Sequence, residues 1–214
     1  MTRIEAVISD FGGVLTSPLL NSFAALQDSS GISLESLGHA MGAIWKRDGA
    51  HPLFELETGR MTEATFLARL GEELSGQLGR DVEMHGFGER YFAHLHPNQQ
   101  LIDYMGTLRD RGYKLAICTN NVREWADRWR AMLPVDDIFS VVVDSAFVGV
   151  RKPERKIYEI TLERLGVPAR AAVMVDDVEL NCDGARDVGM SAVWFQSNEQ
   201  TIDAIEAALS ASGQ

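Results

Sequence analysis

Helix-type and strand-type segments alternate along the chain from residue 98 onward, and this alternation restricts the possible folds more than any other feature. Residues 98–112 have apolar side chains at helical spacing, and 114–119 (KLAICT) have the pattern of a buried strand. The alternation continues through 122–133, 139–144, 153–166, 171–176, 181–189, 191–195 and 201–210. Strands connected through helices form parallel sheets with helices on both faces. The pattern therefore predicts a doubly wound, Rossmann-like α/β fold.

The first half of the chain has a different pattern. A strand is expected at 4–9 (IEAVIS), because its apolar character is typical of a strand buried in a parallel sheet. No convincing strand follows until residue 98, and the helical patterns between them are 22–30, 34–49, 62–79 and 86–95. A helical insertion that folds as a lid above one edge of the sheet is the simplest arrangement. We therefore expect two domains, an α/β core of residues 1–16 and 97–214 and a helical cap of residues 17–96.

The balance of charges limits the partners of this chain. It has 20 basic and 31 acidic side chains, and the resulting net charge of −11 disfavours nucleic acid or an anionic membrane surface as a partner. Cys118 and Cys182 lack metal-ligand spacing, so neither a disulfide framework nor a zinc site is expected. The apolar run at the N-terminus is too short for a signal peptide, and no later run approaches a membrane span. We expect a cytoplasmic protein that is a monomer or a homodimer.

Polar side chains follow the predicted strands at the points where the strands end. They are Asp10, Thr119, Asn120, Lys152, Asp176 and Asp177. Open parallel sheets bind ligands beyond the carboxyl ends of their strands, so these side chains are expected to meet at one edge. Three carboxylates repel one another, and Lys152 alone cannot offset their charge. Mg²⁺ could, because it favours oxygen ligands and leaves positions for water and for phosphate oxygens.

Two glycines follow shortly after the first of these acids, in the stretch SDFGGVLT (9–16). Gly12 can offer its backbone carbonyl as a metal ligand, whatever its side chain. Gly12 and Gly13 together allow the close backbone approach that a bound phosphate requires. The end of the first strand is therefore a candidate site for a small phosphorylated molecule.

Four segments, in order, resemble the motifs of haloacid dehalogenase superfamily hydrolases. They are DFGGVLT (10–16), CTNN (118–121), GVRKPERKIYE (149–159) and VDDVELNCDGARDVGM (175–190). The third and fourth segments, together with TNNVREWADR (119–128), also resemble one branch of that superfamily. This branch holds the N-terminal phosphatase domain of soluble epoxide hydrolase and bacterial sugar-1-phosphate phosphatases, and ETGRMTEATF (57–66) resembles its helical cap.

The resemblance implies a role for each residue that would meet the phosphate. Asp10 would be the nucleophile and would take the phosphoryl group as an aspartyl-phosphate. Thr119 and Asn120 would hold the phosphate oxygens, and Lys152 would neutralise charge on the nucleophile and on the phosphate. These roles agree with the general chemistry of phosphoryl transfer, which depends on positioning and on charge compensation.

The resemblance also implies a magnesium site. Asp10, the carbonyl of Gly12 and Asp177 would hold the ion, and Asp176 would be a further ligand or would orient a bound water. Taken singly, Asp176 or Asp177 could instead cap the following helix, because aspartate is favoured at that position. The ordered set of polar residues after successive strands favours the site.

One expected group is missing. Most phosphatases of this superfamily have a second aspartate two positions after the nucleophile, which protonates the leaving oxygen, and the residue there is Gly12. The similar sugar-1-phosphate phosphatases also have glycine, so a phosphatase of sugar phosphates or lipid phosphates is still expected. Two alternatives stay open: a 2-haloacid dehalogenase that uses the same aspartate without metal, and a catalytically weak module that binds a ligand.

Several large apolar residues have more than one interpretation. Trp125 is expected to pack against the protein, with a place on the wall of a substrate cavity as the less favoured alternative. The spacing of four residues in the insertion favours the core of the cap over its inner face: Met41, Trp45, Phe54 and Phe66.

Overall fold

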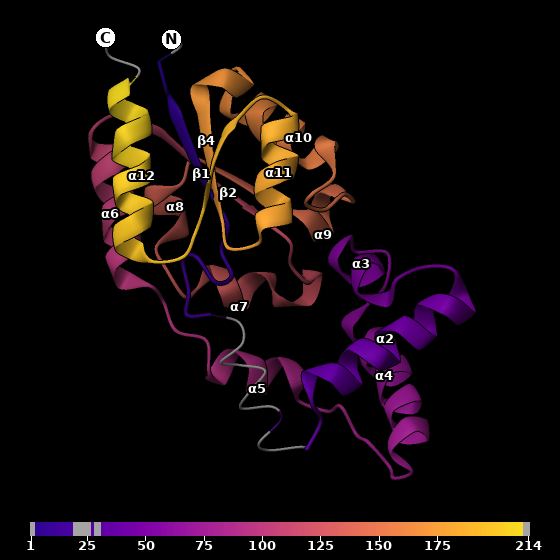
Figure 1. Ribbon diagram of the computed structural model, residues 1–214. Coiled ribbons are helices and arrows are strands. Elements are labelled where there is room, and N and C mark those ends of the chain that lie inside the picture. Colours follow the sequence, from indigo (N-terminus) through magenta and orange to yellow (C-terminus); the bar gives the residue numbers. More distant parts are fainter. Residues whose placement is uncertain (1–2, 19–26, 28–30, 212–214) are drawn as a thin grey trace.

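The computed structural model describes residues 3–18, 27 and 31–211. In these residues five parallel strands form one sheet, in the order β3-β2-β1-β4-β5 (Figure 1). The strands are β1 (Ala6–Ser9), β2 (Lys114–Thr119), β3 (Val141–Asp144), β4 (Ala172–Asp176) and β5 (Ser191–Trp194). The first strand in the sequence lies in the middle, and the strand order reverses on either side of it. The predicted doubly wound α/β fold is confirmed.

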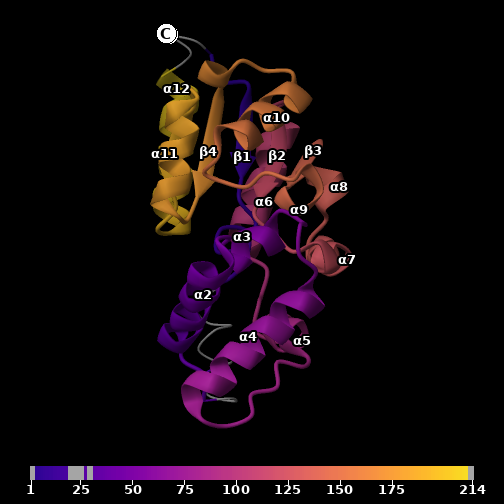
Figure 2. The same cartoon turned by 90° about the vertical axis from the view of Figure 1, so that its right-hand side faces the viewer.

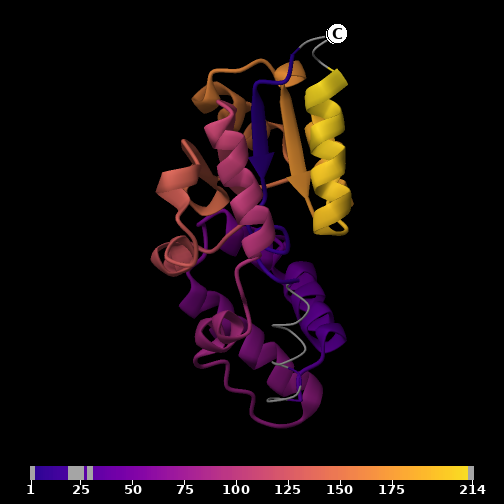
Figure 3. The same ribbon diagram turned by 90° about the vertical axis from the view of Figure 1, so that its left-hand side faces the viewer.

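Helices cover both faces of the sheet. Val7 of β1 packs in a cluster with residues of α6 (Gln99–Asp110) and α12 (Asn198–Ala211), which lie on the side facing the viewer in Figure 3. Its neighbours in β1 point the other way and pack with residues of α10 (Arg155–Leu165) and α11 (Glu179–Asp187). Among the described helices, none combines the length and the apolar character that a membrane span requires.

The carboxyl ends of the strands lie at one edge of the sheet. Ser9 at the end of β1 is in register with Ile117 of β2 and with Val175 of β4. The chain continues this pairing for one more residue, because the N–H of Asp10 donates to the carbonyl of Val175 at 2.8 Å. Thr119 at the end of β2 is likewise in register with the last residue of β3. The segments that follow these strands therefore all begin at the same edge of the sheet.

Short helical elements connect the strands, and the sequence pattern predicted them incompletely. Residues 122–133 were expected to form one helix, but they form the 3₁₀ turn η1 (Arg123–Trp125), then α7 (Ala126–Arg130), then a turn. Trp129 ties this segment to the sheet edge, because its side chain is buried and its Nε1 donates to Asp144 at 3.3 Å. Three further elements were not predicted because they are too short to give a helical period: α8 (Val135–Ile138), α9 (Ser145–Val148) and η2 (Ala169–Ala171).

Within the described residues, four helices lie between β1 and α6. They are α2 (Leu34–Asp48), α3 (Pro52–Glu57), α4 (Glu63–Leu78) and α5 (Phe87–Ala93), and they lie beyond the carboxyl edge of the sheet (Figure 2). The side chains of Ser33 and Thr62 cap α2 and α4 by accepting hydrogen bonds from backbone N–H groups. Apolar residues of these helices form a hydrophobic cluster largely separate from those of the sheet. The helix expected at 22–30 lies outside the described residues, except for Gln27.

The two ends of this helical insertion lie side by side. Thr16 and Pro97 form an isolated β-bridge, and the N–H of Ser17 donates to the carbonyl of His96 at 2.7 Å. The chain therefore leaves the sheet-containing part and returns to it at adjacent points. This arrangement supports our proposed division into a core and a cap at the boundaries given above.

Candidate active site

A buried lysine lies between two carboxylates at the carboxyl edge of the sheet. Lys152 Nζ is 2.8 Å from Asp10 Oδ1 and 2.6 Å from Asp176 Oδ2. Only 1% of the Lys152 side chain is exposed, so these carboxylates take the place of its hydration shell. Asp177 follows Asp176 directly and lines the adjoining cavity. The four charged groups at or beyond the carboxyl ends of β1, β3 and β4 therefore lie together.

Asn120 holds the backbone of the lysine. Its Oδ1 accepts a hydrogen bond from the Lys152 N–H at 2.8 Å, and its Nδ2 donates to the Lys152 carbonyl at 3.0 Å. The side-chain amide is thus occupied by the protein, and its direct effect is on the position of Lys152. Thr119 is buried beside it, and its Oγ1 lies 3.5 Å from the Asn120 carbonyl, at the limit of a hydrogen bond.

The two consecutive acids at the end of β4, Asp176 and Asp177, have different surroundings. Asp176 is fully buried, and its Oδ1 accepts hydrogen bonds from the Val178 N–H at 3.0 Å and from Asn181 Nδ2 at 2.9 Å. Its Oδ2 faces Lys152. Asp176 thus holds both the lysine and the turn that leads into α11. Asp177 is partly exposed to the cavity and is the more accessible acid of the pair.

Gly13 is in close contact with Asp177. Its φ is +79°, and a Cβ at this position would lie 2.1 Å from Asp177 Oδ2. Only glycine fits both the backbone conformation and the space. The N–H of Gly13 donates to Thr16 Oγ1 at 3.0 Å, which closes the turn after Asp10. Gly12, next to it, lines the cavity.

The donor set fits a hard divalent cation. Asp10, Asp176 and Asp177 each offer a carboxylate oxygen, and these three atoms lie within 4.8 Å of one another. Asp10 Oδ1 is buried and accepts no well-directed hydrogen bond, although it is in ion-pair contact with Lys152. A bound Mg²⁺ would satisfy such an oxygen. Because both oxygens of Asp176 already accept hydrogen bonds, Asp10 and Asp177 are the better ligands.

Burial and repulsion raise the pKa values of the acids. Burial raises the pKa of Asp10 to about 7, with Lys152 opposing the rise and Asp176 and Asp177 adding to it. Burial, and then Asp176, raise the pKa of Asp177 to about 6. The pKa of Lys152 is raised overall. Burial alone would lower it, but the attraction of the Asp10 and Asp176 carboxylates outweighs burial. The lysine is therefore charged at neutral pH, whereas full ionisation of the acids requires more positive charge nearby.

A cavity of about 440 Å³ adjoins these groups. Asp10, Gly12, Asn120, Lys152 and Asp177 form its floor, and residues of α2, α3, α4 and α5 form much of its wall. Because the floor carries the acids and the lysine while the opposite wall belongs to the inserted helices, a ligand in the cavity would contact both parts of the chain.

Several apolar residues with two interpretations line this cavity. Trp125 does so and also packs against aromatic rings, with ring centroids 5.0 Å from Tyr91 and 5.3 Å from Phe92, so both interpretations apply to it. Met41, Phe54 and Phe66 line the cavity as well. Trp45 is 53% exposed and is not among the described lining residues.

An ion pair on the cavity wall was missed by the sequence analysis. Arg151 Nε lies 2.6 Å from Glu57 Oε2, and the guanidinium carbon is 4.0 Å from the centroid of the Phe54 ring. The position of Arg151 next to Lys152 is a signal that it lies near the site. Its partner comes from α3, 94 residues away in the sequence, and no local pattern indicates that pairing.

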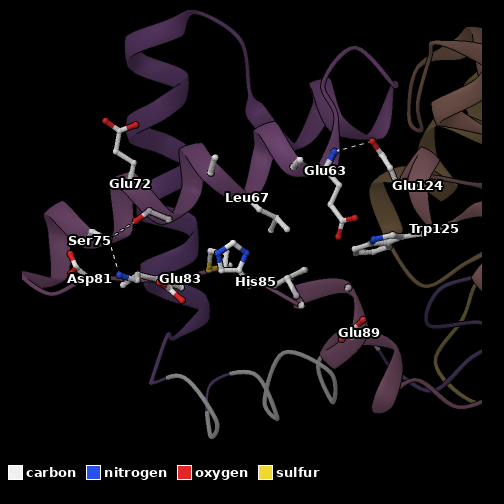
Figure 4. Close-up of a pocket in the computed structure, with 18 of the residues that line it drawn as sticks. Glu63, Leu67, Glu72, Ser75, Asp81, Glu83, His85, Glu89, Glu124 and Trp125 are labelled. Atoms are coloured by element: carbon white, nitrogen blue, oxygen red, sulfur yellow. Dashed lines mark hydrogen bonds between the residues drawn. The ribbon is translucent and has the colours of Figure 1, made fainter.

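A second hollow lies against α4 and the segment that leads into α5 (Figure 4). Among the described residues that line it, six are acidic, and Arg128 is the only lysine or arginine. The labelled acids in Figure 4 include Glu72, Glu83 and Glu89. A hollow with this charge repels a phosphate, so the cavity above Asp10 is the better candidate for an active site.

Comparisons with known proteins lead to one family of hydrolases. A sequence model of the haloacid dehalogenase-like hydrolases matches residues 4–189. A phosphatase of Mycobacterium tuberculosis, MT3486, is 30% identical over 98% of this chain and 95% of its own length. Glyceraldehyde 3-phosphate phosphatase of Pyrococcus abyssi is 44% identical over 93 residues, which cover 42% of this chain and only 38% of that relative.

A solved structure has the same fold. It is a haloacid dehalogenase family enzyme of Bacteroides thetaiotaomicron in complex with magnesium and inorganic phosphate. The TM-score is 0.65 at 19% sequence identity, and the match covers 91% of this chain and 96% of that one. The sequence match over most of the chain shows the family, and the solved structure shows the fold. This chain belongs to the haloacid dehalogenase-like hydrolases.

Proposed function

We propose that this protein is a magnesium-dependent phosphatase that hydrolyses a small phosphorylated metabolite through an aspartyl-phosphate on Asp10. The observation that carries the proposal is the meeting of Asp10, Lys152 and Asp177 on the floor of one cavity. Relatives named as phosphatases, and a family member of the same fold in complex with magnesium and phosphate, support it.

The chemistry follows from the positions of these groups. A carboxylate oxygen of Asp10 forms a bond to phosphorus while the bond from phosphorus to the ester oxygen breaks, and the leaving oxygen takes a proton from water. A water oxygen then attacks the phosphorus, loses a proton to solvent, and the bond between Asp10 and phosphorus breaks to release phosphate. Lys152 offsets negative charge in both steps, while Asn120 and Asp176 hold it in place.

Magnesium would be held by Asp10, Asp177 and the Gly12 carbonyl, and it would supply the positive charge that Lys152 alone does not. The raised pKa values of Asp10 and Asp177 are the reason such charge is needed. Asp10 attacks as a carboxylate, so its ionised form must predominate at the working pH.

Gly12 leaves the site without an acid at the position where many relatives protonate the leaving oxygen. General acid help is worth roughly 10²–10⁴-fold, so its absence slows alkyl esters most. By leaving-group chemistry alone, the site therefore favours esters of good leaving groups, a class that includes both aryl and anomeric phosphates.

Release of p-nitrophenol from p-nitrophenyl phosphate tests the proposal, with Mg²⁺ or with EDTA. Asp10→Asn removes the nucleophile and is expected to lower kcat by at least about 10³-fold. Asp183→Asn is the matched control, because Asp183 is an exposed acid on α11 that pairs with Arg186. It is expected to keep wild-type activity.

Three results would contradict the proposal. Turnover by a verified Asp10→Asn preparation would remove the nucleophile assignment. Halide release from 2-haloacids that EDTA does not inhibit would favour a dehalogenase. Binding of Mg²⁺ and phosphate without turnover of any ester would favour a binding module.

A further inference from the structure

The walls of the catalytic cavity are apolar where they face away from the acids. Twelve of the described lining residues come from the inserted helices, and nine of these twelve are apolar. The other three are Glu57, Glu63 and Tyr91. We propose that the organic group of the substrate is apolar, such as an aryl or alkyl-aryl group, and not a sugar. This inference rests on the phosphatase function proposed above.

Several of the polar side chains around the cavity are occupied by one another, and among the described lining residues Trp125 Nε1 is a buried donor without an acceptor. Glu57 is paired with Arg151 at 2.6 Å, and the amide of Asn120 is hydrogen-bonded to the backbone of Lys152. Asn181 donates its amide N–H to Asp176. The hydroxyl groups of a sugar would therefore leave water for a cavity that offers few partners in exchange, and each unpaired hydroxyl weakens binding.

The remaining acid on the wall, Glu63, lies at the boundary with the second hollow. It lines both hollows, as does Trp125, and Figure 4 shows its carboxylate directed toward the indole of Trp125. An ideal Cβ at Gly88 would lie 3.0 Å from Glu63 Oε1 and 2.9 Å from Trp125 Nε1, so both atoms lie against the same glycine. Glu63 therefore makes the edge of the cavity polar, while the rest of the wall formed by the inserted helices stays largely apolar.

Apolar side chains also remain exposed around the same cavity. Phe54 is 40% exposed, Val178 is 48% exposed and Leu180 is 62% exposed, and all three line the cavity. Phe54 comes from the inserted helices, whereas Val178 and Leu180 lie beside Asp177 at the start of α11. Exposed apolar residues that share one hollow are typical of a binding surface for an apolar group. The cavity thus has apolar side chains both on its wall and among its solvent-exposed lining residues.

A matched pair of substrates tests the polarity of the organic group. 4-Propylphenyl phosphate and 4-(2,3-dihydroxypropyl)phenyl phosphate have nearly the same size and the same phenol leaving group, and they differ by two hydroxyls. We expect kcat/KM to be at least about tenfold higher for the propyl ester, because each hydroxyl that leaves water without a new hydrogen-bond partner weakens binding by about fivefold or more. Phenyl phosphate sets the baseline without a side chain.

Variants locate the effect in the cavity. Met41→Gln on the wall and Leu180→Ser beside Asp177 are expected to reduce the ratio of kcat/KM between the propyl and dihydroxypropyl esters by several-fold, mainly through KM. Leu78→Ser is the matched control, because Leu78 is 38% exposed at the end of α4 and is not among the described lining residues. It is expected to leave the ratio unchanged.

Acetyl phosphate separates this inference from the proposed function. Its good leaving group and small size make it a substrate for a competent site of this kind, whatever the wall accepts. One result would contradict the apolar organic group but not the phosphatase function. It is hydrolysis of acetyl phosphate together with a kcat/KM for the dihydroxypropyl ester that equals or exceeds that for the propyl ester. Absence of phosphate release from all of these compounds would overturn both.

Discussion

A single methyl group at Gly13 would change where the carboxylate of Asp177 can lie. The Cβ of alanine would meet Asp177 Oδ2 at 2.1 Å, and the backbone there has a φ of +79°. We expect Gly13→Ala to weaken Mg²⁺ binding by at least about tenfold, since the displaced carboxylate is one of the proposed ligands. Isothermal titration with Mg²⁺ measures the change.

Gly49→Ala is the control for this variant. Gly49 has a φ of +73° at the end of α2, and a Cβ there would meet no atom within 4 Å. Both variants carry the strain of a left-handed alanine, about 1–2 kcal/mol, but only Gly13→Ala adds the clash. Wild-type Mg²⁺ affinity in Gly13→Ala would show that Asp177 does not bind the ion.

Individual residues of the site differ in how far the sequence predicts them. The sequence predicts that three charged residues lie close together: Asp10, Lys152 and Asp177. The reason is that parallel strands end at one edge of the sheet and each of these residues follows a strand. The sequence does not reveal that the Asn120 amide is occupied by the Lys152 backbone. That contact depends on how two loops meet, and neither loop has a periodic pattern that fixes its conformation.

At the scale of elements, α3 is attached to the sheet-containing part through Glu57. Its carboxylate pairs with Arg151, and its carbonyl accepts a hydrogen bond from Ser145 Oγ. We expect Arg151→Met to destabilise the fold by about 1–3 kcal/mol, because Glu57 is then left buried without its partner. The double variant Arg151→Met/Glu57→Gln should recover part of this loss. Urea denaturation of the four proteins in the cycle gives the coupling free energy.

The loss of folding stability in Arg151→Met should also depend on pH. Burial raises the pKa of Glu57 even while Arg151 opposes the rise, and removal of Arg151 raises it further. A carboxyl with a raised pKa in the folded state binds its proton more tightly there than in the unfolded chain, so folding becomes more favourable as pH falls toward that pKa. Arg151→Met should therefore regain stability relative to wild type as pH falls from neutral. Equal pH dependence of the two proteins would contradict an unpaired buried Glu57.

The elements themselves were predicted best where they are long and periodic. All five strands and the helices α2, α4, α6, α10 and α12 lie within or close to their expected ranges, since burial on one or both faces imposes a period. The helices α3, α8 and α9 have six residues or fewer. Elements of that length form through their contacts with the rest of the fold, and their own sequence shows no helical period.

At the scale of the whole molecule, magnesium should stabilise the fold more at higher pH. Without the ion the pKa of Asp10 is raised to about 7 and that of Asp177 to about 6, so binding below these values must displace protons. Apparent Mg²⁺ affinity should rise between pH 5.5 and 8, by up to about tenfold per pH unit for each proton released.

The Mg²⁺-induced shift in Tm across this pH range measures the effect. Sodium chloride at equal ionic strength is the control, because the net charge of −11 makes the protein sensitive to salt in general. A shift in Tm that does not change with pH would contradict Asp10 and Asp177 as the ligands.

The β-bridge between Thr16 and Pro97 has a consequence for how this chain can change over time. The points where the chain enters and leaves the insertion are neighbours. The sheet-containing part therefore does not need an insertion of one particular length or shape to connect them. An exchange of the residues between them for a longer, shorter or differently shaped segment would leave the strand order and the acids in place. New substrates could thus be acquired by replacing one contiguous stretch of the gene, while the reaction chemistry is inherited unchanged.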